Sequence, residues 1–383
     1  MVTTKTFTNN PNFKSYKIGH LLDFHQRSCK LEPDQVYQLV TVKRRNEGIV
    51  SRGIFKGSDI KTPSQFYIKD GDFLISKRQI VHGACEIVPS EFDGAIVSNE
   101  YTIATGKEDK VLTKYFNLLS KTNFMKNHYF LSSYGVDIEK MVFNLEDWKK
   151  RLVNIPSIEE QRKVIAFFDV MENKIQLQWG KINLLKKQKI GYLQKIFSQE
   201  MRFKKSDGQE YPEWKNFKLN ELANYISSNI SIEQYKEFKG EEFYPLYDAN
   251  KIICKIDSYS FEENYISIIK DGAGVGRIRL LPGKSSIVGT MGAIQSKDLT
   301  IVGTNFLYYF LQKVNFNKYV SGSTIPHIYF KDYGNEIVSL PCIKEQEKII
   351  SFLSSIDSKI QLEKLKYDII VEQKKAFMQQ IFI

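Results

Sequence analysis

The chain has 383 residues, which is enough for two domains that each bury a hydrophobic core. Hydrophobic residues make up 42% of it, so the composition excludes an intrinsically disordered protein. There is no run of 18 apolar residues and no apolar signal segment near the start, so we expect neither a membrane span nor secretion. Four widely spaced cysteines without a CxxC pair are typical of reduced thiols, which favours a cytoplasmic location.

The formal net charge of +11 favours a polyanionic partner such as nucleic acid. The charge is uneven, because residues 206–339 contain 14 Lys and Arg against 16 Asp and Glu. Any polyanion that binds this part of the chain must therefore contact a local basic patch.

The first region, residues 1–152, is predicted to form short strands joined by turns. Val36–Val42 is rich in β-branched and aromatic residues and predicts a strand. Residues 66–68 and Phe73–Ser76 predict two more strands around a Lys-Asp-Gly-Asp turn, and residues 112–121 have the pattern of a helix. We interpret this region as one α+β domain.

A long helix is predicted within residues 153–205. Pro156 stands at its start, and Ser157 with Glu160 three residues later has the pattern of a capping box, in which side chains satisfy free backbone N–H groups. Gly180 and Gly191 each weaken the helix by about 1 kcal/mol, so packing must stabilise it.

The second region, residues 206–339, repeats the order of the first. Tyr265–Ile269 predicts a strand, residues 271–276 a glycine-rich turn, residues 277–281 the returning strand, and residues 304–313 a helix. The beginnings of the two regions also agree. We therefore predict one α+β fold in both regions, with different loops.

The last segment, residues 340–383, repeats the first helix 185 positions later: residues 155–167 read IPSIEEQRKVIAF, and residues 340–352 read LPCIKEQEKIISF. Cys342 replaces the capping serine, so the second cap should be weaker. Both copies carry apolar residues at spacings of three and four, the pattern of a coiled-coil seam. The predicted seam contains Ile165, Phe168, Met171, Ile175, Ile182 and Ile196 in the first copy, and Ile350, Leu353, Ile356, Ile360 and Ile381 in the second.

The reach of the chain predicts how the helices pair. A helix over residues 157–202 spans about 68 Å at 1.5 Å per residue, whereas the connector 203–213 covers at most about 36 Å. A parallel pair would require the chain to return to the start of the first helix before the second begins. We therefore predict an antiparallel coiled coil with a pseudo-two-fold internal repeat.

The sequence contains no convincing catalytic or metal-binding set. Residues 272–276 read GxGxG instead of the dinucleotide-binding GxGxxG, and no helix pattern follows them. The five histidines lack metal-ligand spacing. The Asn/Asp-Pro-Pro-Tyr/Phe string of amino-methyltransferases is also absent.

Polar and basic residues cluster instead where predicted strands end. Arg and Lys bind guanine edges and phosphates, and Asn and Gln bind adenine, so such clusters favour a DNA-binding surface, although a solvated basic surface is the alternative for each residue. The candidates in the first region are Lys43, Arg44, Arg45, Asn46, Lys77, Arg78 and Gln79. In the second region they are Lys270, Arg277, Arg279 and Lys284, with Ser323, Thr324 and His327 in a polar loop that could equally be an ordinary loop.

The order domain–helix–domain–helix, with each helix beginning on Pro-x-x-x-Glu-Gln at residues 156–161 and 341–346, resembles the specificity subunit of type I restriction-modification enzymes. The resemblance covers essentially the whole chain. Residues 71–77 resemble the family's GDxLIS(R/K) strand, with residues 268–272 as a looser counterpart. The family's Pro-x-x-Arg-Phe lead-in is absent from the N-terminus, whereas residues 207–214 retain a version of it.

The resemblance implies an α+β fold in which two similar target recognition domains, residues 1–152 and 206–339, are joined by two spacer helices. Each domain would read one half of a split, asymmetric site in double-stranded DNA. The helices would set the spacing and, through the seam residues named above, dock two methylation subunits, with restriction subunits joining them. This chain would itself be non-catalytic and bind no cofactor, because S-adenosylmethionine, ATP and Mg belong to the partner subunits. No membrane partner is implied.

A coiled-coil scaffold that links two protein-binding modules without binding DNA is the alternative interpretation. Salt-dependent binding to duplex DNA, measured with the methylation partner present, distinguishes the two.

Overall fold

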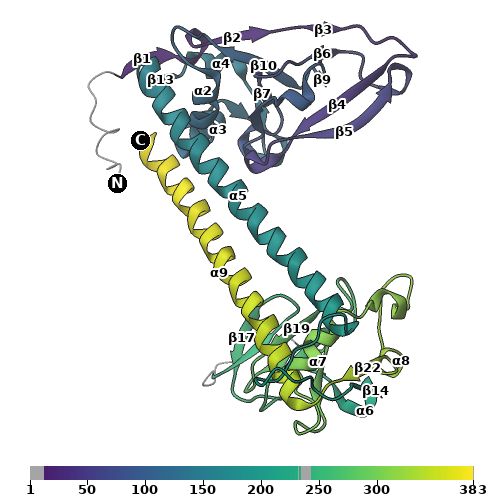
Figure 1. Cartoon of the computed structure of the whole chain (residues 1–383). Coiled ribbons are helices and arrows are strands. Elements are labelled where there is room, and N and C mark those ends of the chain that lie inside the picture. Colours follow the sequence, from purple (N-terminus) through teal and green to yellow (C-terminus); the bar gives the residue numbers. More distant parts are fainter. Residues whose placement is uncertain (1–12, 232, 234–242, 383) are drawn as a thin grey trace. The chain divides into compact units, whose positions relative to one another are not determined.

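The computed structural model describes residues 13–231, 233 and 243–382. The chain forms two compact units (Figure 1). Unit 1 comprises Met1–Gln178 with Lys366–Ile383, and unit 2 comprises Trp179–Leu365. Each unit therefore combines a globular domain with parts of two long helices.

In both units the globular domain begins and ends on one antiparallel strand pair. β1 (Lys14–Lys17) pairs with β13 (Leu152–Ile155) in unit 1, and β14 (Lys215–Lys218) pairs with β22 (Ile337–Leu340) in unit 2. The last strand of each pair leads directly into a long helix. The two ends of each domain are thus fixed together at the helix start.

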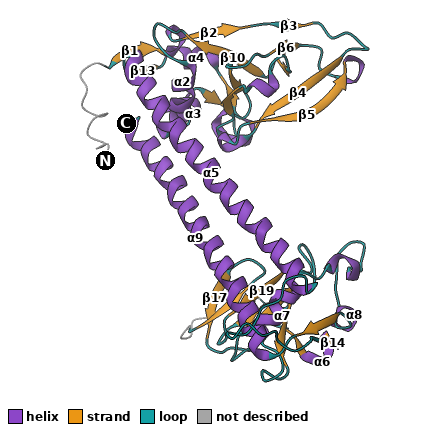
Figure 2. Ribbon diagram, in the orientation of Figure 1, coloured by secondary structure: helices purple, strands orange, loops and turns teal. Residues whose placement is uncertain are grey.

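The first sheet of unit 1 is antiparallel and packs against short helices (Figure 2). Its core contains the aromatic side chains of Phe73, Phe116 and Trp148, which meet edge to face. The strand order is β2 (Leu22–His25), β10 (Tyr101–Gly106), β7 (Phe73–Ser76) and β8 (Cys85–Ile87); the helices are α2 (Thr113–Ser120), α3 (Asn123–Leu131) and α4 (Leu145–Lys150).

The second sheet of unit 1 is mixed. β4 and β9 are parallel, and the other neighbours are antiparallel. The strand order is β3 (Ser28–Cys29), β6 (Gln65–Tyr67), β9 (Ile96–Ser98), β4 (Val36–Val42) and β5 (Ile49–Lys56), and a separate pair joins β11 (Ser133–Tyr134) to β12 (Val142–Phe143).

Unit 2 also has a four-stranded antiparallel sheet and a mixed sheet, although its mixed sheet has fewer strands, so the prediction of two similar α+β domains is confirmed. Its antiparallel sheet has the order β15 (Ala223–Ser227), β21 (Met291–Ser296), β18 (Tyr265–Ile269) and β19 (Ile278–Leu281). Its mixed sheet has the order β17 (Ile252–Ile256), β16 (Tyr244–Tyr247) and β20 (Ser286–Ile287), with β16 and β20 parallel. The helices of the domain are α6 (Leu219–Leu222), α7 (Thr304–Leu311) and α8 (Phe330–Tyr333).

The two long helices are α5 (Ile158–Phe197) and α9 (Ile343–Ile381). The serine half of the predicted capping box is present, because the Glu160 backbone N–H donates to Ser157 Oγ at 3.4 Å, whereas the Glu160 side chain pairs with Lys163. Among the described residues, none of the helices combines the length and the apolar character that a membrane crossing requires.

Contacts within each unit show that α5 and α9 run antiparallel. In unit 1 the rings of Phe167 and Phe377 lie 5.1 Å apart, and in unit 2 those of Tyr192 and Phe352 lie 5.0 Å apart. The predicted antiparallel pairing is therefore confirmed. The predicted seam residues Phe168, Met171, Ile182, Ile196, Leu353, Ile360 and Ile381 are buried, and Ile165, Ile175, Ile350 and Ile356 are half-buried.

The salt bridges between the two helices repeat with the sequence. In unit 2 Lys189 Nζ lies 2.6 Å from Asp357 Oδ1, and in unit 1 Lys374 pairs with Glu172. Lys374 and Asp357 are the residues 185 positions after Lys189 and Glu172. The same ion pair is thus formed twice, with the two helices exchanging roles.

Candidate nucleic-acid interface

The glutamine of the repeated Glu-Gln motif fixes each domain to its helix. In unit 1 Gln161 Oε1 accepts from the Leu112 backbone N–H at 2.8 Å. Gln161 Nε2 donates to the carbonyl oxygens of Lys110 at 2.8 Å and Pro156 at 3.0 Å. The side chain is fully buried, so all three bonds form away from water.

Gln346 makes the equivalent bonds in unit 2. Its Oε1 accepts from the Gly303 backbone N–H at 3.1 Å, and its Nε2 donates to the carbonyl oxygens of Ile301 and Pro341, both at 2.9 Å. The repeated motif therefore joins the start of α5 or α9 to the loop before α2 or α7. The sequence could have indicated this role, because both copies of the repeat keep a glutamine at the same position near the start of the helix, where it is buried.

The glutamate before this glutamine differs between the copies. Glu345 is fully buried and accepts from Trp214 Nε1 at 3.0 Å and from Arg202, whose Nη2 lies 2.8 Å from Glu345 Oε2. Hydrogen bonding to this carboxylate raises the pKa of Arg202 above its ordinary value. Glu160 instead pairs with Lys163 on its own helix at 2.8 Å.

Unit 1 brings the two predicted basic segments, residues 43–46 and 77–79, together at the ends of β4 and β7. Arg44 Nε donates to Gln79 Oε1 at 2.6 Å, and the Asn46 backbone N–H donates to the Gly83 carbonyl at 3.0 Å. Arg45 and Asn46 have φ angles of 60° and 54°, a left-handed conformation that is uncommon for residues other than glycine. The chain thus turns sharply where β4 ends, beside the end of β7.

Two of the predicted cations in unit 1 are paired with carboxylates that the sequence did not indicate. Arg44 Nη2 lies 2.7 Å from Glu139 Oε2, and Arg78 Nε lies 2.7 Å from Glu100 Oε2. Lys77 Nζ donates to the Asn99 carbonyl at 2.6 Å. In the part of unit 1 that the structure describes, the exposed side chains of Lys43 and Arg45 have neither a hydrogen-bond nor an ion-pair partner.

Unit 2 places a lysine at the equivalent strand end. Lys270 follows β18 as Lys77 follows β7, and its Nζ donates to Ser227 Oγ at 2.5 Å. Arg277 Nη2, across the glycine-rich turn, donates to the Ala249 carbonyl at 2.9 Å and to Asn250 Oδ1 at 2.8 Å. Both domains therefore present a cation at the end of the corresponding strand.

The predicted polar loop of unit 2 lies against the same turn. His327 Nδ1 is 2.7 Å from Asp271 Oδ1, and the backbones of Ser321 and His327 bond to each other. The exposed residues Ser323 and Thr324 lie in the loop that this pair closes. Asp271 is a member of the site that the sequence did not indicate.

The other two predicted cations of unit 2 lie apart from this turn. Arg279 is half-buried in β19, donates to the Asp248 carbonyl at 3.1 Å, and lies over the Tyr247 ring. Lys284 follows the opposite end of the β18–β19 hairpin, where its Nζ is 3.9 Å from Glu262 Oε1. The structure thus divides the predicted patch, and DNA contact by any of these residues stays a prediction.

The carboxylate of Asp248 remains charged beside Arg279. Burial opposes the charged form, but hydrogen bonds from the backbone N–H groups of Lys251 and Asn250 and the charge of Arg279 hold the pKa of Asp248 below its ordinary value. The described residues hold no cluster of three or more His, Cys, Asp or Glu side chains placed to bind a metal ion.

Comparison with known proteins finds a family match over part of the chain. Residues 211–372 match the family described as type I restriction modification DNA specificity domain. The chain is 29% identical over 199 residues to the type I restriction enzyme MjaVIII specificity subunit of Methanocaldococcus jannaschii, a match that covers 49% of this chain but only 46% of that relative. It is 24% identical to the putative type I restriction enzyme MjaX specificity subunit of the same organism, over 99% of this chain and 97% of that one.

A solved structure agrees in fold. The type I restriction-modification system S subunit of M. genitalium superposes with a TM-score of 0.58 at 15% identity, over 100% of this chain and 99% of that chain. The fold is that of an S subunit. The family match covers 162 of the 383 residues, and the chain as a whole is similar to type I restriction enzyme specificity subunits.

Proposed function

We propose that this chain is the DNA-recognition subunit of a type I restriction-modification complex, in which each globular domain reads one half of a bipartite, asymmetric site in double-stranded DNA. The observation that carries this proposal is the pair of polar, basic surfaces at equivalent strand ends, beside Lys77 in unit 1 and Lys270 in unit 2. Cations in such positions bind phosphates, and the neighbouring Asn, Gln, Ser and Thr side chains read base edges.

The differences between the domains support an asymmetric site. Unit 1 surrounds its lysine with Arg44, Arg78 and Gln79, whereas unit 2 surrounds its lysine with Arg277, Asp271 and His327. Different donors and acceptors on one framework select different bases. The two half-sites should therefore differ in sequence.

Two methylation subunits fit the repeat of the helices. Leu177 and Leu362 occupy equivalent positions and are 76% and 51% exposed, and Leu184 and Ile369 are equivalent and 57% and 48% exposed. Exposed apolar side chains at repeated positions favour partners that bind in two equivalent ways. In this proposal the chain is not catalytic, restriction subunits join the assembly in the cytoplasm, and S-adenosylmethionine, ATP and Mg are bound by the partner subunits.

The experiment is an exchange of one domain followed by genome-wide mapping of methylated adenines. Residues 14–155 are replaced by the equivalent domain of a relative, with both junctions placed at the β1–β13 pair so that α5 is unchanged. The proposal predicts a bipartite motif in which only one half changes. A scaffold without DNA recognition predicts that the methylated motif is unchanged by the exchange.

A further inference from the structure

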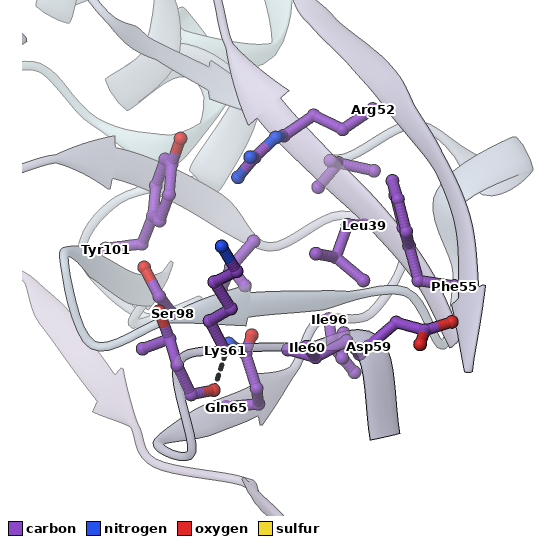
Figure 3. A pocket seen from close by; sticks show the side chains of 13 residues that line it. Leu39, Arg52, Phe55, Asp59, Ile60, Lys61, Gln65, Ile96, Ser98 and Tyr101 are labelled. Carbon is purple, nitrogen blue, oxygen red and sulfur yellow. Dashed lines mark hydrogen bonds between the residues drawn. The ribbon is translucent and has the colours of Figure 1, made fainter. Parts of the chain in front are cut away.

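Unit 1 contains a cavity of about 270 Å³ beneath the β4–β5 hairpin (Figure 3). It is lined by strands of the mixed sheet and by Tyr101 at the start of β10. Pockets for drug-sized ligands measure roughly 300–1,000 Å³, so this cavity is close to the lower end of that range.

Two cations point into the cavity. Figure 3 shows Arg52 and Lys61 extending toward the space between Tyr101 on one side and Phe55 on the other, while the carboxylate of Asp59 points away from both cations. In the part of the chain that the structure describes, neither Arg52 nor Lys61 has an ion-pair or hydrogen-bond partner. Two unpaired cations in a pocket favour an anionic ligand.

The position of Arg52 depends on an irregularity in the strand. Leu39 pairs with Gly53 and Val40 with Ser51, which leaves Arg52 as an extra residue in β5. Gly53 has a φ of 119°, which glycine adopts more readily than other residues. A β-bulge of this kind redirects a side chain, and here it places Arg52 and Phe55 on the same cavity.

An unsatisfied amide lies at the base of the cavity. Gln65 is only 4% exposed, and its Nε2 donates to the Thr62 carbonyl at 2.9 Å. Its Oε1 is buried and has no hydrogen-bond donor among the described residues. A buried acceptor without a partner costs free energy, so a ligand with an N–H group would gain by meeting it.

The cavity adjoins the basic surface of unit 1. Tyr101 pairs with Ser76, the residue before Lys77, and the hydroxyls of Tyr101 and Thr41 lie 3.1 Å apart. Thr41 lies two residues before Lys43. A ligand in the cavity is therefore next to the surface proposed above to bind DNA.

We infer that this cavity binds a single nucleotide, with the phosphate between Arg52 and Lys61, the base against Phe55 and Tyr101, and an N–H of the base on Gln65 Oε1. Aromatic rings and cations together are the usual means of holding an unstacked nucleotide. The nucleotide comes either from solution or from the bound DNA as an extrahelical base. The second source rests on the proposed function, whereas the first does not.

The mixed sheets of the two units differ, which is a reason to expect the cavity in unit 1 alone. Within residues 213–231, 233 and 243–340, the mixed sheet has the order β17, β16, β20, and none of its strands corresponds to β6, the strand that supplies Gln65. The nucleotide site is therefore assigned to unit 1.

The test uses the full chain and two probes. The first arm titrates the four nucleoside 5′-monophosphates by calorimetry. The second compares a perfect duplex with the same duplex carrying one extrahelical nucleotide, with the methylation subunits present. Variants are Phe55→Ala, Gln65→Leu and Arg52→Gln with Lys61→Gln; the control is Lys56→Gln, an exposed cation on the same strand that does not line the cavity.

We expect binding of at least one monophosphate, weakened about tenfold or more by each cavity variant and unchanged in the control. If the wild type prefers the duplex with the extrahelical nucleotide about tenfold, and the cavity variants lose this preference, the bound nucleotide comes from DNA. If monophosphates bind without such a preference, the bound nucleotide comes from solution. If neither monophosphates nor the extrahelical nucleotide bind more tightly to the wild type than to the variants, the cavity is not a nucleotide site. Failure of the wild type to bind the perfect duplex would instead count against the proposed function, and the first arm still decides the cavity.

Discussion

Gln161 and Gln346 satisfy backbone groups at the junction where a domain meets its helix. Each makes three hydrogen bonds, two of them to a loop that is far away in the sequence. A buried amide suits this position, because it offers a donor and an acceptor without the cost of burying a charge. This explains why the motif repeats glutamine at a buried position.

Substituting Gln161 by Leu should therefore destabilise unit 1. The change leaves the Leu112 N–H and the Lys110 carbonyl without partners, so we expect the free energy of unfolding to fall by about 2–4 kcal/mol, measured in urea. Gln346→Leu should do the same in unit 2. Gln176→Leu, on the exposed face of α5, is the control and should change stability by less than about 0.5 kcal/mol. Equal effects at all three positions would contradict this role.

In the proposed function, the carboxylates around the basic surface of unit 1 compete with DNA for its cations. Glu139→Gln releases Arg44 from its exposed ion pair, so duplex affinity should rise and the salt dependence should increase by about one counterion. Lys43→Ala should lower both the duplex affinity and its salt dependence. Melting temperatures should hardly change, since exposed ion pairs contribute little to stability. Glu146→Gln, which frees Lys149 outside this surface, is the control. An unchanged affinity in both Glu139→Gln and Lys43→Ala would remove this surface from the DNA interface.

At the scale of elements, the strands and helices with a regular apolar pattern were the most predictable from the sequence. β4 and β18 have the predicted bounds, because Val36–Val42 and Tyr265–Ile269 are short runs of β-branched and aromatic residues with turns beside them. The antiparallel pairing followed from chain length alone. The partners of Arg44 and Arg78 could not be predicted, because Glu139 and Glu100 lie in other parts of the chain and only the tertiary fold brings them near.

The cavity in unit 1 shows a second limit of sequence analysis. The sequence analysis did not single out Arg52, and only the pairing register of β4 with β5 reveals that it is the extra residue of a bulge. Likewise, the split between Lys284 and Lys270 depends on which end of the β18–β19 hairpin each follows. Spacing in sequence does not distinguish the two ends of a hairpin.

The repeated ion pairs between α5 and α9 should contribute unequally to stability. Lys189 is less exposed than its equivalent Lys374, at 11% against 32% of the side chain, and Asp357 also accepts from the Tyr309 hydroxyl at 3.0 Å. We expect Lys189→Met to cost about 1–3 kcal/mol in urea unfolding and Lys374→Met to cost less. Lys187→Met, exposed on α5, is the control. A larger loss at Lys374 than at Lys189 would contradict this order.

At the scale of the whole molecule, the sequence repeat and the helix pairing have a common midpoint. Gly180 and Leu365 are repeat equivalents, and next to them Lys181 Nζ lies 3.0 Å from Glu363 Oε1. α5 begins 22 residues before Gly180, and the antiparallel α9 begins 22 residues before Leu365, so this length of helix occurs once in each direction. In the proposed function this length sets the gap between the two half-sites in DNA.

The most direct test of this account inserts four helical residues after Gly180 and four more after Leu365, so that the pairing of α5 with α9 is kept. Four residues add about 6 Å and close to one full turn, and duplex DNA rises about 3.4 Å per base pair. Mapping of methylated adenines in cells that carry this variant should show both half-sites unchanged and the gap lengthened by one or two base pairs. Two-residue insertions at the same places rotate one end by about half a turn and should abolish methylation. A folded four-residue variant that methylates the original motif with its original gap would contradict the account.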